Sequence, residues 1–178
     1  MNLDYDGTMK ALPPQFQQNF KTLETRYAAE VLDDVAADDA TAVARYLICL
    51  KWVAGLGQSR DGFLRDPAAK NPAGMATALT NRAATYDGLA GAAESLKGPE
   101  TMTTAGTELA AAMHDMGDVD RKVVSDLRLS VLDKMRGERE KAYLAAANRL
   151  NDAARGLVEA ASEFYAPGIV QTLLAAVE

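Results

Sequence analysis

The stretch from Asp118 to Tyr165, DVDRKVVSDLRLSVLDKMRGEREKAYLAAANRLNDAARGLVEAASEFY, decides the fold class of this chain. It contains no proline, and its apolar residues recur at close to helical intervals while arginine and glutamate fill the opposite positions. This period places one apolar stripe along a helix. The stripe consists of Val124, Leu127, Val131, Met135, Ala142, Leu150, Ala153, Leu157, Ala161 and Phe164. We therefore predict one long C-terminal helix of over 40 residues, kinked or broken near Gly137 or Gly156, with Leu127, Val131 and Leu150 buried.

Other helical segments lie on both sides of this stretch. Apolar stripes, caps and glycine or proline boundaries predict helices over residues 13–35, 40–56, 72–97, 101–116 and 169–177. The helix over 101–116 is expected to stop at Gly117. Residues 1–12 lack periodicity and predict a mobile N-terminal tail. No segment alternates like a strand, so we predict an all-α fold, an antiparallel bundle of four to six helices that forms a single domain over residues 13–178.

The composition excludes several classes of site. The 178 residues include one cysteine and one histidine, which rules out an internal disulfide, a multi-cysteine zinc site and a two-histidine metal site. The net charge of −6 argues against a nucleic-acid partner. No apolar run reaches the roughly 20 residues of a transmembrane helix, and no signal peptide is visible. We expect a cytoplasmic protein, or one exported without a cleavable signal peptide.

The two rarest side chains do not predict catalysis. His114 lies between Met113 and Met116, where a core stripe falls, and is interpreted as a packed residue. Cys49 lies in an apolar helix and is interpreted as a buried thiol, because a nucleophilic cysteine needs an electropositive, partly exposed setting. We therefore expect no catalytic residue, no metal and no cofactor. An enzyme centred on His114 is the least favoured alternative.

Residues 57–74, GQSRDGFLRDPAAKNPAG, form a long predicted loop that offers a candidate interface. Within it, Phe63, Leu64 and Arg65 combine an aromatic, an aliphatic and a cationic side chain, as interface anchors do. The alternative is that they fold back over the core. Just before the second predicted helix, the acids from Glu30 to Asp39 have no base among them and are interpreted as a solvated corner with a capping aspartate.

A second candidate surface is the basic window, residues 121–141. It holds seven bases and four acids, a net charge of +3. On one long helix this window would present a positive face to an acidic partner or to anionic lipid, and we expect Arg128, Arg136 and Arg139 to bind the partner. The alternative is a solvated face closed by ion pairs between residues four apart.

With no chemistry visible, the sequence favours a non-enzymatic helical protein–protein interaction module. Such a module could be an adaptor, a chaperone-like or inhibitory partner, or a bacterial secreted effector domain, and its partner would be another protein or a second copy. The alternative is a peripheral module that binds an anionic membrane surface through the basic window.

Overall fold

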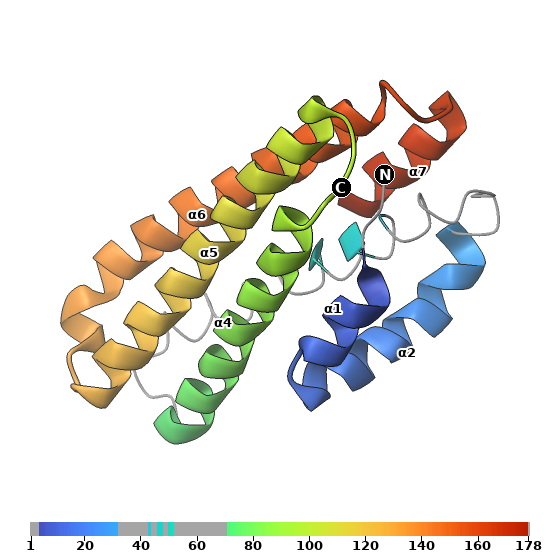
Figure 1. Cartoon of the computed structure of the whole chain (residues 1–178). Coiled ribbons are helices and arrows are strands. Elements are labelled where there is room, and N and C mark those ends of the chain that lie inside the picture. Colours follow the sequence, from blue (N-terminus) through green and yellow to red (C-terminus); the bar gives the residue numbers. More distant parts are fainter. Residues whose placement is uncertain (1–3, 32–42, 44–45, 48–49, 52–70, 178) are drawn as a thin grey trace.

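The chain folds as an all-α helical bundle in the computed structural model, which describes residues 4–31, 43, 46–47, 50–51 and 71–177. Three long helices lie side by side and run in alternating directions (Figure 1): α4 (Pro72–Glu94), α5 (Glu100–Arg128) and α6 (Leu132–Ala161). α5 packs against both of the others, and α1 packs on the free side of α4. The predicted all-α bundle is confirmed.

The first two helices are α1 (Tyr5–Ala11) and α2 (Pro14–Val31). α2 begins where the paired prolines predict, but α1 replaces the tail expected over residues 1–12. Asp4 caps α1, since its Oδ1 accepts a hydrogen bond from the Gly7 amide at 2.9 Å. Leu12 is buried in the core. Its side chain packs against α4 at Gly88, where a Cβ atom would collide with it. Residues 4–12 therefore belong to the bundle, because Leu12, which directly follows this short helix, packs against α4.

α4 begins as predicted and ends slightly early. The Asn71 side chain caps it by accepting from the Gly74 amide at 2.8 Å, and Pro72 takes the first turn. The helix ends at Glu94, three residues before the predicted end. Its inward stripe is buried as expected at Leu79, Tyr86 and Leu89.

α5 passes through the predicted stop at Gly117. That glycine is buried in mid-helix, where the Ala83 carbonyl of α4 lies 3.5 Å from the place a Cβ would occupy. A helix-interior glycine costs only about 1 kcal/mol, so packing on α4 suffices to keep the helix intact. The prediction of a helix end at Gly117 is wrong.

The stretch 118–165 is not one long helix, and its break lies at neither of the predicted glycines, because the chain reverses after α5. Ser130 has a φ of 55°, in the left-handed region. The Val131 amide donates to the Asp126 carbonyl at 3.0 Å and the Ser130 amide to that of Leu127 at 3.2 Å, which is a Schellman ending with serine in the usual place of glycine. α6 then runs unbroken through both Gly137 and Gly156. A left-handed serine costs about 1–2 kcal/mol, which burial of α6 against α5 offsets.

The core lies mainly along α4, α5 and the second half of α6. Tyr143, Leu150 and Leu157 of α6 are buried in it, and α7 (Pro167–Val177), the predicted last helix, adds Leu173. Leu150 is buried as predicted, whereas Leu127 and Val131 are half-buried. The helix predicted over residues 40–56 lies largely outside the described residues. Five of its residues are described: the apolar side chains Val43, Tyr46, Leu47 and Leu50 are buried, and Lys51 is exposed.

Gly106 lies where the backbones of α4 and α5 come close together. A Cβ there would lie 2.7 Å from the Ala93 carbonyl oxygen, whereas a Cβ at Gly156 would meet nothing within 4 Å. We expect Gly106→Ala to lower the free energy of unfolding by about 1–3 kcal/mol, since two backbones must separate. Gly156→Ala, the matched control, should raise it by about 0.5–1 kcal/mol. Urea unfolding of both variants checks this, and equal shifts would contradict the close approach.

Candidate interaction surface

Part of what the sequence predicts lies outside the described residues. The loop triad Phe63, Leu64 and Arg65, the thiol Cys49 and most of the acidic run belong to this part. Among the described residues, no helix combines the length and apolarity needed to cross a membrane. In the same residues no three histidine, cysteine or carboxylate side chains converge as metal ligands would.

The structure divides the basic window between two antiparallel helices. Its first part ends α5, its second part begins α6, and the Schellman turn lies between them. The window is therefore the end of a helical hairpin, and its charges face each other across the α5–α6 seam. The i,i+4 pairs expected along one helix give way to other pairings.

Two of the three predicted arginines are held by aspartates. Arg139 Nε lies 2.6 Å from Asp126 Oδ2 across the seam, and the side chains are only 16% and 8% exposed. This hydrogen bond raises the pKa of Arg139 above its usual value, so the guanidinium stays charged and the pair fastens α6 to α5. Arg136 Nη2 contacts Asp133 Oδ1 at 2.7 Å, one turn away. Only Arg128 remains exposed and without an ion pair among the described residues.

Lysines supply the other accessible charges of the hairpin end. Like Arg128, they are exposed and make no ion pair within the part of the chain that is described. We call this set the basic end: Lys122, Arg128, Lys134 and Lys141. Sequence reasoning counted these lysines in the window but did not select them, because pairing depends on the hairpin register.

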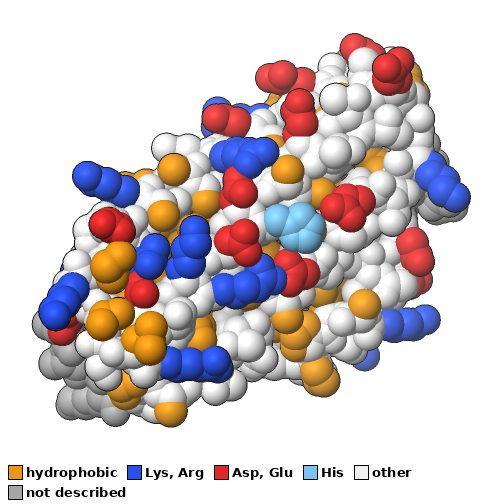
Figure 2. Space-filling view, turned by 60° about the vertical axis from the view of Figure 1, so that its left-hand side comes forward, with side chains coloured by type: hydrophobic (Ala, Val, Ile, Leu, Met, Phe, Trp, Pro, Cys, Tyr) orange, Lys and Arg blue, Asp and Glu red, His pale blue; other side chains and the backbone are white. Residues whose placement is uncertain are grey.

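An exposed leucine lies among these charges. Leu129, the last residue before the turn, is 67% exposed, and Leu144 further along α6 is also exposed. On the face shown in Figure 2, basic and hydrophobic side chains gather toward the left of the view. A single exposed leucine is common on protein surfaces, so Leu129 contributes to a candidate interface only together with the unpaired bases of the hairpin end.

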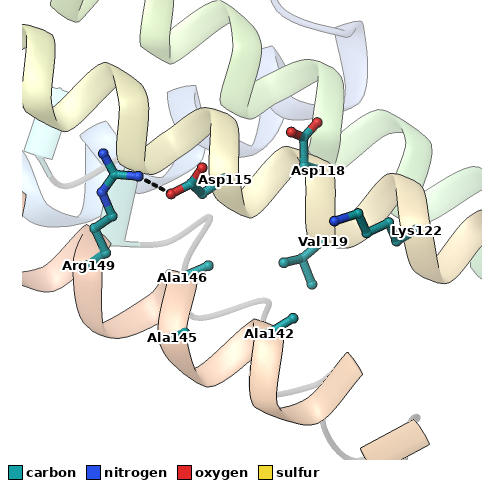
Figure 3. Close-up of a pocket in the computed structure, with 8 residues that line it drawn as sticks. All are labelled: Asp115, Asp118, Val119, Lys122, Ala142, Ala145, Ala146 and Arg149. Atoms are coloured by element: carbon teal, nitrogen blue, oxygen red, sulfur yellow. Dashed lines mark hydrogen bonds and ion pairs between the residues drawn. The ribbon is translucent and has the colours of Figure 1, made fainter. Parts of the chain in front are cut away.

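A groove of about 290 Å³ runs beside the seam (Figure 3). Its apolar lining is Val119 from α5 with Ala142, Ala145 and Ala146 from α6. We call this the alanine groove. Asp115 and Arg149 pair at one end of it, while Asp118 and Lys122 border it along α5. Because the α6 side chains are methyl groups, the two helices leave a hollow where larger residues would close the seam.

His114 belongs to a surface cluster rather than to the core. Its neighbours Met113 and Met116 are buried as predicted, but the His114 side chain is 45% exposed. Its Nδ1 lies 3.1 Å from Asp87 Oδ1 and its Nε2 lies 3.4 Å from Glu94 Oε1. Figure 2 shows the histidine surrounded by carboxylates. The imidazole therefore bridges α5 to two acids of α4, and the interpretation of His114 as a packed residue is wrong.

Arg121 extends this cluster. It pairs with Asp87 of α4 and, at 2.8 Å, with Asp118 of its own helix. The hydrogen bond that Arg121 donates to Asp87 is the main cause of the raised pKa of Arg121. In this cluster each carboxylate of α4 is engaged by a side chain of α5, an arrangement that ties two helices together.

Comparison with known proteins gives no match: no family model, no curated protein and no solved structure is significantly similar to this chain.

Proposed function

We propose that this chain is a non-enzymatic helical interaction module that binds an acidic protein surface through the basic end. The observation that carries the proposal is the exposure of four bases without ion pairs, among the described residues, on the same helical hairpin as the exposed Leu129. Neighbouring arginines are neutralised by aspartates, so these four charges are the ones free to meet a partner. Complementary charges of this kind govern encounter rate and register.

Reversal of the unpaired charges is expected to remove binding but not stability. Arg128→Glu, Lys134→Glu and Lys141→Glu together should weaken binding of a polyglutamate peptide about tenfold or more. Their effect on the free energy of unfolding should stay within about 1 kcal/mol, because exposed charges contribute little. Fluorescence anisotropy at low and high salt measures the first quantity, and urea unfolding measures the second.

The matched control makes the same change of net charge elsewhere. Lys51, Lys97 and Arg155 are exposed and have no ion pair among the described residues, so their reversal to Glu should weaken binding far less. Equal losses in the two triple variants would show that only net charge matters and would contradict a localised site. Binding that is insensitive to salt would contradict it too, because screening acts within about 8–10 Å at ordinary salt.

An anionic membrane surface is the second candidate, favoured by the exposed Leu129 at the tip of the hairpin. Insertion of one leucine into the membrane contributes about 1.5–3 kcal/mol to the free energy of membrane binding. Each nearby base contributes about 1 kcal/mol to the same free energy. Glu138, an acid on the same end of α6 without an ion pair among the described residues, reduces this sum. The total is comparable to a single myristoyl chain, which binds membranes only marginally. A protein partner is therefore the better explanation, and flotation with anionic vesicles tests the alternative.

A further inference from the structure

The alanine groove continues into the basic end. On α5, Lys122 borders the groove and Leu129 follows it by seven residues, close to two turns, so both lie on one side of the helix. On α6, Lys134 and Lys141 precede the groove residue Ala145 by eleven and four residues, which again places them on one stripe. A ligand in the groove would therefore extend along the hairpin between these lysines.

The size of the groove suits a side chain of a larger partner. About 290 Å³ lies at the lower end of the range for small-molecule pockets, and Figure 3 shows Val119, Ala142 and Ala146 directed toward the space between α5 and α6. Farther along α6, Leu150 and Leu157 fill the space against the core. An aliphatic side chain of a partner protein would fill the alanine groove in the same way.

A helix fits this lining better than an extended chain. The floor consists of alanine and valine side chains, which offer no hydrogen-bond partner to a backbone. An extended segment would leave N–H and C=O groups unpaired against these methyls, whereas a helix pairs them internally. Methyl groups also allow close approach of a third helix, and an amphipathic helix in an apolar groove is a common mode of recognition.

The charges along the alanine groove determine which charge the flanks of a bound partner helix should carry. Asp115 is paired with Arg149, and Asp118 is paired with Arg121. The bases left over beside the groove are Lys122, Lys134 and Lys141, against one acid, Glu138, all without ion pairs among the described residues. An acidic ligand is favoured over a neutral or basic one. A flat lipid surface cannot enter the hollow, which favours a peptide over a bilayer.

We infer that the alanine groove receives an amphipathic helix of a partner protein, with an aliphatic side chain seated between Val119 and Ala145 and with acidic flanks against Lys122, Lys134 and Lys141. This inference rests on the proposed function and specifies its partner. Leu129, at the tip of the hairpin, lies on the same side of α5 as Lys122. A second apolar side chain of the partner helix would contact it there.

The test uses the full chain and a labelled synthetic peptide of about 18 residues, five helical turns. The peptide carries leucines on one face and glutamates on both flanks. A scrambled peptide of equal composition, with the leucines spread around the helix, separates groove binding from plain charge attraction. We expect the amphipathic peptide to bind about tenfold or more tightly than the scrambled one. Anionic vesicles form a third arm.

Filling the groove provides the second comparison. Ala145→Trp should occupy the hollow and weaken binding of the amphipathic peptide about tenfold, whereas Asn151→Trp, an exposed position on another side of α6, should leave it unchanged. Methyl NMR on the unaltered protein gives a readout that does not depend on a variant. Peptide addition should shift the signals of Val119 and of the three groove alanines, and stationary signals would overturn the inference.

The remaining outcomes separate this inference from the proposed function. Equal binding of both peptides, lost on reversal of the basic end, would keep the acidic partner and overturn the groove. Binding of neither peptide would overturn both. Binding of vesicles but of neither peptide would replace both with the membrane alternative.

Discussion

Asp120→Ala is expected to lower the free energy of unfolding by about 3–5 kcal/mol, since it leaves a buried guanidinium without its main counter-ion. Asp120 of α5 accepts two hydrogen bonds from Arg82 of α4, Nε to Oδ2 at 2.7 Å and Nη2 to Oδ1 at 2.5 Å. The two side chains are 4% and 0% exposed. A charge at this depth has little access to water, so truncation of the carboxylate leaves much of the desolvation penalty of Arg82 uncompensated. Urea unfolding followed by circular dichroism measures the loss.

A surface aspartate two residues away supplies the control. The Asp118 side chain is 64% exposed and pairs with Arg121, so Asp118→Ala should cost no more than about 1 kcal/mol. Joint replacement of Arg82 and Asp120 by methionine and leucine should recover most of the loss, because apolar residues of similar volume often replace a buried pair at little cost. A loss below about 1 kcal/mol for Asp120→Ala would show that water reaches the pair.

Leu150→Ala should have the next largest effect, a loss of about 2–5 kcal/mol in the free energy of unfolding. Leu150 of α6 is 2% exposed and lies in the main core cluster. Removal of its side chain leaves a cavity that the surrounding helices α5 and α6 can close only in part. Thermal and urea unfolding measure the loss.

The comparison residue is Leu127, which belongs to the same apolar stripe in the sequence. The structure places it half-buried beside the small cluster of Leu79, Val123 and Val124. Water already covers part of the Leu127 side chain, so Leu127→Ala should cost clearly less than Leu150→Ala. Similar losses for the two variants would contradict the position of the turn between α5 and α6.

Helix starts could be predicted from the sequence where the signal is local. Asn71 and Pro72 begin α4, and Pro14 begins α2, because a capping side chain and a proline act within one turn of the residues that carry them. The apolar stripes predicted the all-α fold for the same reason: burial on one helix face needs only a period.

Helix ends followed the tertiary structure instead. Gly117 stays helical because a neighbouring helix packs on it, and Ser130 turns the chain because α6 gains its burial by folding back. The neighbouring sequence does not distinguish Gly117 from glycines that end a helix, nor Ser130 from serines that continue one. The sequence did not predict α1, because its residues form no apolar stripe; the core residue Leu12 follows the helix directly and packs where Gly88 has no side chain.

The same distinction between local sequence signals and tertiary packing applies to the candidate site. The helical character of the chain, the basic charge of residues 121–141 and the exclusion of multi-cysteine and two-histidine metal sites all follow from composition and short-range period. Which bases are left without an ion pair among the described residues depends on tertiary packing. Arg139 finds Asp126 thirteen residues away and Arg82 finds Asp120 thirty-eight residues away, because antiparallel packing brings together charges that no local pattern relates. The alanine groove has the same origin, since its small residues become a hollow only when α6 lies against Val119.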